Sequence, residues 1–249
     1  MGKDWCLSLL IVLTVFSIVC GSFLRNSDEL TGNCFDNHFG RDSCIFCTYG
    51  ETPHILIEPG EPAVDFTLHD VSGKGYTLSH LLKKKPVVLL WGMYTCPAYQ
   101  GLADYLKEEK FRESSYEHEY SMVDDYHNLV TFVHLYGPEP HPMTPFSNFD
   151  TGVPRPQYWS IVPQAQSYSE RVEMAQKIKG DLHPQTIILP DYLPENGYGG
   201  ETNEVWCTLG LGARTSMLIG TDGLVKYTQD WFHKTELQEA IDMHLKGSL

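Results

Sequence analysis

Basic residues are scarce in this chain. Its 249 residues include 18 Lys and Arg against 32 Asp and Glu, which gives a formal net charge of −14. A surface of this sign repels phosphate groups, so the composition argues against nucleic acid and anionic lipid as partners. We interpret the excess of acidic residues as a surface that promotes solubility.

Long apolar runs are also few. The only one spans residues 6–20, after a short start that contains Lys3 and before the small residues Gly21 and Ser22. A charged start, a run of roughly 15 apolar residues and small residues at its end are typical of a signal peptide. A helix that crosses a membrane needs about 20 apolar residues, so this run is short for one. We therefore predict a signal peptide over 1–21 and a secreted or lumenal protein. The alternative is an uncleaved anchor that holds the protein to a membrane.

Cysteine is uncommon, and the number of cysteines is odd. Seven cysteines are present, two of them within the predicted signal peptide. Cleavage would leave five, namely Cys34, Cys44, Cys47, Cys96 and Cys207. Thiols tend to pair in the secretory pathway, so an odd number leaves at least one for other chemistry or for another molecule. The count is a first indication of a working thiol.

Residues 22–60 have little apolar periodicity and form a predicted extension that contains three of these cysteines. Cys34, Cys44 and Cys47 are spaced as in a small disulfide knot. With His38 as a fourth ligand they could also bind zinc, but a secretory compartment favours disulfides. We therefore predict no metal, and a single domain over 61–249.

From residue 61 onward, segments with strand and helix character alternate. We predict strands over 63–68, 86–92, 129–136, 186–191, 214–220 and 224–227, and helices over 78–82, 99–112, 167–179 and 234–245. A Pro-rich insert separates two of these segments, from 137 to about 163, and no internal repeat is present. This order indicates an α/β domain with a mixed sheet that helices cover on both faces.

Cys96 lies where the predicted buried strand 86–92 gives way to a helix. Reactive groups of open α/β sheets collect at that edge, and the N–H groups of a helix start favour thiolate over thiol. Pro97 suits a first helical turn, and the hydroxyl of Thr95 can donate to the sulfur. The alternative is a buried cysteine that only packs. The position favours a reactive thiol.

Several motifs carry a family resemblance. Residues 63–68, the strand 86–90 and the Thr95-Cys96-Pro97 turn resemble the redoxin branch of the thioredoxin superfamily, and within it the iodothyronine deiodinases. That family places selenocysteine, or cysteine in its relatives, between Thr and Pro. Residues 132–136 with 139–142 resemble its strand that ends in an acidic residue and a histidine. The resemblance covers about residues 60–245 and implies a thioredoxin-like fold.

The resemblance implies an activity. The Cys96 thiolate would be the nucleophile on an iodinated, thyroxine-like small molecule, with no bound cofactor and an external thiol as reductant. It also implies a homodimer, although no dimer interface can be read from the residues. Two departures weaken the match. Cysteine is a weaker nucleophile toward iodine than selenocysteine, and Ala98 and Tyr99 stand where the family has proline and Phe.

Two other functions stay open. Gly212-Ala213-Arg214 replaces the cis-proline segment of thioredoxins, and peroxiredoxins carry an Arg at that place. A thiol peroxidase of the peroxiredoxin type is therefore one alternative, with Cys96 oxidised to a sulfenic acid. A non-enzymatic secreted binding module with a thioredoxin fold is the other.

Four further residues are candidate partners of Cys96. Arg214 begins the strand expected beside that of Cys96, where a guanidinium would stabilise a thiolate. His141 and Glu139 follow a strand end and can act as acid or base. Tyr99 rules out a CxxC pair, so Cys207 or an outside thiol would have to resolve oxidised Cys96. His134, within the apolar strand, is interpreted as a core residue with satisfied hydrogen bonds.

Overall fold

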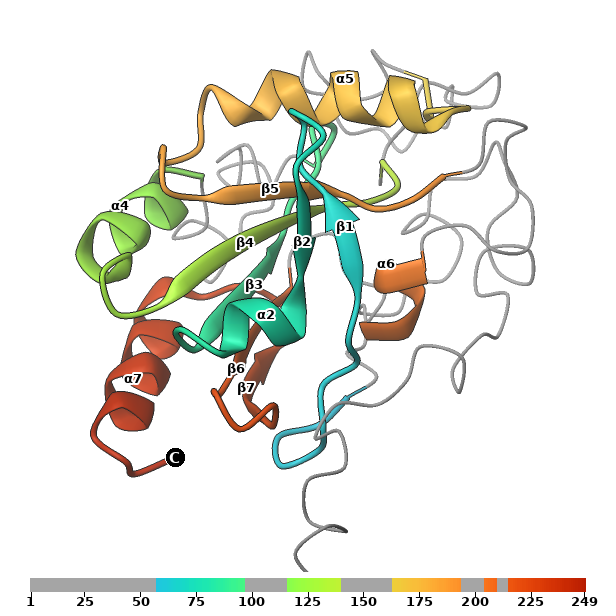
Figure 1. Cartoon of the computed structure of the whole chain (residues 1–249). Helices are drawn as coiled ribbons and strands as arrows, with labels where there is room; N and C mark the ends of the chain where they lie inside the picture. The colour runs from blue at the N-terminus through green and yellow to red at the C-terminus, as the bar shows by residue number, and fades with distance from the viewer. Residues whose placement is uncertain (1–56, 97–115, 140–162, 194–203, 210–214) are drawn as a thin grey trace, which may run out of the picture.

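The computed structural model describes residues 57–96, 116–139, 163–193, 204–209 and 215–249. Its centre is a five-stranded sheet of order β5-β4-β3-β6-β7 (Figure 1). The strands are β3 (Val87–Trp91), β4 (Thr131–Tyr136), β5 (Ile187–Pro190), β6 (Ser216–Ile219) and β7 (Val225–Gln229). β3, β4 and β5 are parallel, whereas β6 and β7 run antiparallel to their neighbours. The sheet is therefore mixed, as predicted.

Helices connect and cover these strands. They are α2 (Leu78–Leu82), α4 (Tyr116–Tyr126), α5 (Tyr168–Lys179), α6 (Glu204–Leu209) and α7 (Lys234–Leu245), and β1 (Thr67–His69) and β2 (Gly75–Thr77) form a separate hairpin. The parallel pair β3–β4, followed later by the antiparallel pair β6–β7 and the last helix, makes this a thioredoxin-like α/β fold. The expected fold class is confirmed.

Two apolar cores sandwich the sheet. Along β3, Val87, Leu89 and Trp91 belong to one core, and Val88 and Leu90 belong to the other. This is the two-residue alternation of a strand with both faces covered. The first core includes side chains of α2, α5 and α6, and the second includes side chains of α4 and α7. Figure 1 shows α5 on one side of the sheet and α4 beside α7 on the other.

Most predicted elements are confirmed, with shifts of a few residues. The main correction is the strand predicted over 63–68, because regular pairing covers only β1, and Pro62 forms an isolated bridge to Leu224 instead. At the start of α2, the N-cap residue Thr77 makes no side-chain hydrogen bond to the helix. The Ser79 N–H donates instead to the Asp65 carboxylate at 2.9 Å. The helix predicted over 99–112 lies outside the described residues, and α4 and α6 were not predicted.

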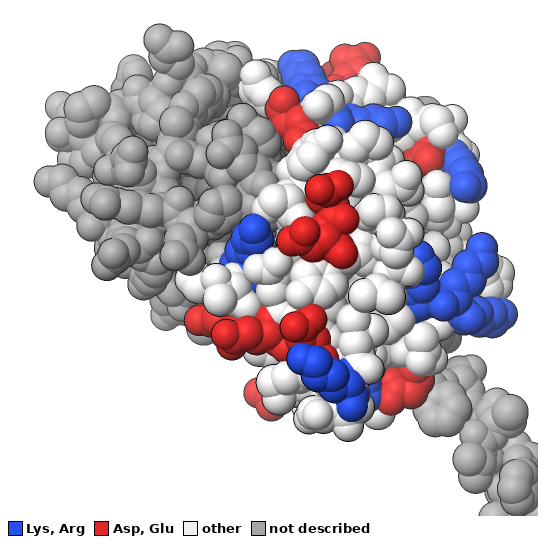
Figure 2. Space-filling view, turned by 90° about the vertical axis from the view of Figure 1, so that its left-hand side faces the viewer, with Lys and Arg blue, Asp and Glu red and all other residues white. Residues whose placement is uncertain are grey.

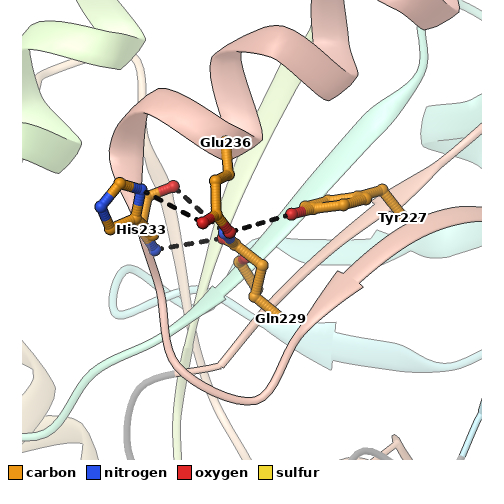
Figure 3. Close-up of polar contacts among 5 residues, drawn as sticks. Tyr227, Gln229, His233 and Glu236 are labelled. Atoms are coloured by element: carbon orange, nitrogen blue, oxygen red, sulfur yellow. Dashed lines mark hydrogen bonds and ion pairs between the residues drawn. The ribbon is translucent and has the colours of Figure 1, made fainter. Parts of the chain in front are cut away.

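A polar cluster attaches the last strand to the last helix. In Figure 3, Glu236 of α7 points toward Tyr227 and Gln229 of β7 and toward His233, which precedes the helix. Gln229 Nε2 donates to Glu236 at 3.1 Å, and Gln229 Oε1 accepts from the His233 N–H at 3.2 Å. Gln229 Oε1 also accepts from the hydroxyl of Ser216 on β6 at 2.7 Å. The cluster fixes α7 over the β6–β7 end of the sheet.

Charged side chains of both signs are interspersed on the side of the molecule where α4 and α7 lie (Figure 2). Exposed carboxylates of these helices include Asp124, Glu236 and Asp242. Among the described residues, none of the helices has the length and hydrophobicity needed to cross a membrane. The predicted signal peptide over 1–21 and residues 22–56 of the extension predicted over 22–60 lie outside the described residues.

Candidate functional site

Cys96 lies just beyond the C-terminal end of β3, in the turn 92–96. Its N–H donates to the Met93 carbonyl at 3.1 Å, and its side chain is buried, with 3% of the residue exposed. On one side, the Trp91 N–H donates to the Thr215 carbonyl at 3.0 Å, so the chain that leads into β6 runs beside the start of this turn. The structure therefore places Cys96 at the sheet edge where α/β proteins bind ligands. Residues 97–115 are outside the described part, so its place at a helix start stays a prediction.

Thr95 is turned toward Glu139. Its N–H and its hydroxyl both donate to Glu139 Oε2, at 2.8 and 2.7 Å, and Thr95 is fully buried. This corrects the expectation that the hydroxyl donates to the Cys96 sulfur, because its single proton is used by the carboxylate. Glu139, predicted as a candidate acid, is thus bonded to the residue that precedes Cys96.

Both the carboxylate and the backbone of Glu139 are hydrogen-bonded to neighbouring residues. Its second carboxylate oxygen accepts from the Tyr136 hydroxyl. Its backbone forms a reciprocal pair with the Gln164 amide, in which the Glu139 N–H donates at 2.9 Å and Gln164 Nε2 donates to the Glu139 carbonyl at 3.1 Å. Such a fully bonded, buried carboxyl has a fixed orientation.

The same burial changes how Glu139 ionises. Loss of water around the carboxyl raises its pKa, and the hydrogen bonds from Tyr136 and Thr95 and the charge of Arg171 oppose this effect without cancelling it. Burial, and then the neighbouring Glu139, raises the pKa of Tyr136 well above its ordinary value. Burial therefore makes Glu139 a weaker acid than an exposed carboxyl.

This shift predicts a specific dependence of stability on pH. The unfolded chain releases the Glu139 proton near the ordinary value of 4.5, whereas the folded protein keeps it to higher pH. In that window the folded state binds more protons, so the contribution of Glu139 to the free energy of unfolding falls as pH rises. We expect the stability difference between wild type and Glu139→Gln to be largest below pH 4.5 and to shrink above it. Urea unfolding of both proteins from pH 4 to 8 measures this, and a difference that grows with pH would contradict the assignment.

Arg171 connects this cluster to α5 and to the segment that follows β5. It lies in α5, is fully buried and donates from Nη1 to the Asp191 carbonyl at 3.1 Å. The Asp191 carboxylate in turn accepts the N–H groups of Tyr192 at 2.8 Å and of Val205 in α6 at 3.3 Å. Arg171 therefore supplies a buried positive charge that acts on Glu139 and anchors the end of β5.

His134 and Glu119 form a second buried polar group on β4 and α4. Nε2 of His134 lies 2.9 Å from the Gly92 carbonyl, and Nδ1 lies 3.1 Å from Glu119 Oε1. The exposed fraction is 0% for His134 and 2% for Glu119. The interpretation of His134 as a core residue with satisfied hydrogen bonds is confirmed.

Three predicted site residues have side chains that the structure does not describe. Arg214 and His141 lie in 210–214 and 140–162, and Cys207 lies in α6 without a described side chain. The predicted adjacency of the strand after Arg214 to that of Cys96 is confirmed, since Ser216 pairs with Leu90. The roles of these residues stay predictions, as do the disulfides of Cys34, Cys44 and Cys47.

Sequence reasoning missed the residues that support Glu139. Tyr136, Gln164 and Arg171 were not singled out as site residues. One signal was available for Arg171, because it falls on the apolar stripe of α5 together with Met174, Ala175 and Ile178. A charged residue within such a stripe is buried only with partners. Nothing in the sequence pairs Gln164 with Glu139, 25 residues away.

The similarity of this chain to known proteins is confined to solved structures. No protein-family model matches the chain, and no curated protein matches it. Similar solved structures include an uncharacterized conserved protein from Geobacillus kaustophilus, at 13% identity over 78% of this chain and 86% of that one, with a TM-score of 0.49. A thioredoxin-like protein from Aeropyrum pernix has 16% identity, coverage of 72% and 88% and a TM-score of 0.42. The peroxidoxin BcpB from Mycobacterium tuberculosis is 15% identical over 76% of this chain and 97% of that one, with a TM-score of 0.40.

Proposed function

We propose that this protein is a thiol-dependent oxidoreductase whose nucleophile is the Cys96 thiolate. One observation carries the proposal: Cys96 lies in a turn at the C-terminal edge of β3, and the residue before it is bonded twice to a buried carboxyl of raised pKa. A nucleophile next to a group that can hold a proton is what thiol chemistry requires. An inert structural cysteine has no need of such a neighbour.

The substrate class follows from the resemblance to iodothyronine deiodinases. In this reading the Cys96 sulfur attacks iodine on an aromatic ring and forms an S–I bond as the C–I bond breaks. The ring carbon keeps the electron pair and takes up a proton. An external thiol then attacks the sulfenyl iodide, releases iodide and leaves a mixed disulfide. A second thiol reduces that disulfide, restores Cys96 and completes a two-electron reduction of the substrate.

Glu139 is proposed as the store of that proton. Its carboxyl is buried beside Thr95, and burial favours its protonated form. His141, two residues further on, is the proposed carrier between Glu139 and the substrate, and Arg214 the proposed partner of the thiolate. Cys207 remains the proposed intramolecular resolving thiol, with an outside thiol as the alternative.

A thiol peroxidase is the second candidate, and the burial of Cys96 favours it. With 3% of the residue exposed, the sulfur is more accessible to a hydroperoxide than to a two-ring iodothyronine. The thiolate would attack the terminal peroxide oxygen, break the O–O bond and form a sulfenic acid, while the alkoxide takes up a proton. The same external thiol would then reduce Cys96, with release of water.

Turnover of two substrates distinguishes the deiodinase function from the peroxidase function. With dithiothreitol as the reductant, the deiodinase reading predicts iodide release from thyroxine that exceeds the rate of hydroperoxide consumption. The peroxidase reading predicts the reverse. Activity toward neither substrate would support the third alternative, a secreted thioredoxin-fold binding module. Cys96→Ser serves as the blank for both assays, so that only chemistry at this thiol is counted.

The cellular setting of this chemistry is proposed from the sequence. A signal peptide over 1–21 would deliver the chain to a secretory lumen or the outside, or an uncleaved segment would anchor it to a membrane. The proposed partners are the small-molecule substrate, a thiol reductant and a second copy of the chain. A disulfide map of the secreted protein would show which of the five remaining cysteines stays reduced.

A further inference from the structure

Side chains from one segment of the chain, residues 134–139, form hydrogen bonds with both ends of the turn that carries Cys96. At the far end, Glu139, three residues after β4, holds Thr95. At the near end, His134 of β4 holds the carbonyl of Gly92 at 2.9 Å. The proposed function uses the first contact and leaves the second unexplained.

The atoms in contact decide where the protons lie. A carbonyl oxygen only accepts, so Nε2 of His134 must donate to Gly92. Nδ1 then faces the carboxyl of Glu119 at 3.1 and 3.3 Å, and one further proton has to lie between them. Whether that proton sits on nitrogen or on oxygen, the pair has no net charge. Such a pair can be buried without an isolated charge, which would otherwise be very costly.

We infer that His134 is a positioning residue for Cys96, with Glu119 as the residue that orients its ring. β4 supplies the ring, α4 supplies the carboxyl that fixes it, and the Gly92 carbonyl transmits the constraint to the turn 92–96. This inference rests on the proposed function, because it concerns the reactivity of the same thiol. It adds α4 to the elements that determine the reactivity of the Cys96 thiolate.

Two substitutions of His134 separate the Gly92 contact from the Glu119 contact. The amide nitrogen of glutamine reaches about as far as Nε2, so His134→Gln keeps the donor to Gly92. His134→Asn is too short to reach that carbonyl and keeps a polar group near Glu119. The inference predicts that the asparagine variant disturbs the Cys96 thiolate and that the glutamine variant largely preserves it.

The readout is the alkylation of Cys96 by iodoacetamide in the full chain, quantified peptide by peptide with mass spectrometry. The ratio of the rates at pH 6 and pH 9 reports the thiolate fraction and cancels differences in access. An ordinary thiol reacts roughly 200-fold more slowly at pH 6 than at pH 9, since its pKa is about 8.5. A thiol with a pKa near 7 or below loses about tenfold or less.

We expect His134→Asn to shift this ratio by at least about tenfold toward that of an ordinary thiol, and His134→Gln to stay within about threefold of wild type. If both variants match wild type, or if the glutamine variant shifts as far as the asparagine variant, the inference is wrong. If wild type itself behaves as an ordinary thiol, the proposed function fails instead.

Further variants guard against a failure to fold. In His134→Leu with Glu119→Leu, apolar side chains replace the buried pair, a change that proteins often tolerate, and the Gly92 contact is lost. This double variant should shift the ratio as the asparagine variant does. Glu119→Gln can still donate to Nδ1 of a neutral ring, so it should preserve the ratio, and a shift as large as that of the double variant would overturn the inference.

Two controls complete the set. Val123→Ala loosens the packing of α4 and leaves the His134 and Glu119 side chains unchanged, so a shift equal to that of His134→Asn would show general loosening and overturn the inference. Glu236→Gln makes the same chemical change in a His–Glu pair whose carboxylate is exposed and whose atoms lie 3.9 Å apart, and it should leave the ratio unchanged. A shift in Glu236→Gln as large as in the double leucine variant would likewise count against a specific role of His134.

Discussion

Replacing Cys96 with serine is expected to abolish turnover of whichever substrate the wild type accepts, by at least about 1,000-fold in kcat. A serine hydroxyl at the same place is a poor nucleophile at neutral pH and cannot form the sulfur intermediates of either proposed cycle. Iodide release and hydroperoxide consumption, each with saturating reductant, measure the loss.

The serine variant should keep its fold, because it exchanges one atom in the turn. Its thermal unfolding is the control, together with the same substitution at Cys207. If Cys207 is the resolving thiol, Cys207→Ser slows only the reductive half and leaves one rapid turnover. Retention of full activity in Cys96→Ser would place the chemistry on another cysteine.

Replacing Arg171 with methionine is expected to have the largest effect on stability, a loss of about 3–5 kcal/mol in the free energy of unfolding. Arg171 is fully buried, donates to the Asp191 carbonyl and is a source of positive charge for Glu139. Without it the carbonyl loses this donor, and the carboxyl of Glu139 loses one of the groups that stabilise its ionised form. Urea unfolding at pH 7 measures the loss.

A double substitution tests the physical reason. Once Arg171 is methionine, the ionised form of Glu139 keeps the hydrogen bonds from Tyr136 and Thr95 but loses the stabilisation by Arg171, so adding Glu139→Gln should cost less than it costs in wild type. Arg171→Lys keeps the charge but loses the planar fork, and an intermediate loss is expected. Additive effects of Arg171→Met and Glu139→Gln would show that the two side chains do not act on each other.

Much of the fold could be predicted because its signals are local. The buried strand of Val87–Trp91 is a continuous apolar run, and the hairpin of β6 and β7 is marked by a turn in which Gly223 has a φ of +79°. The helix predicted over 167–179 forms over 168–179, and the Ser167 side chain caps it by accepting the N–H of Glu170. In each case the residues that form the element also encode it.

The strand predicted over 63–68 failed for the opposite reason. Alternation of apolar residues indicates which side chains are buried, and Ala63, Val64 and Phe66 are indeed buried. It does not indicate which backbone groups pair. The Ala63 N–H donates to the carbonyl of Gly223, far along the chain, so only Thr67–His69 remains for regular pairing in β1.

The central residues of the site could be predicted from the sequence, but the contacts that hold them in place could not. A cysteine between a buried strand and Pro97 is a local signal, and Glu139 was singled out from its place after a strand. The contacts that fix them join residues 44 apart for Thr95 and Glu139, and 42 apart for Gly92 and His134. Only the folded chain brings these residues together, so the sequence alone could not show that two anchors hold one turn.

The central claim is that Cys96 is an activated thiolate, and the pH dependence of its alkylation tests this most directly. Iodoacetamide labelling of the full-length protein at pH 6 and pH 9, resolved at the Cys96 peptide, should show a fall of about tenfold or less between the two pH values. The same fall as in N-acetylcysteine, roughly 200-fold, would contradict the account and leave Cys96 a cysteine that only packs.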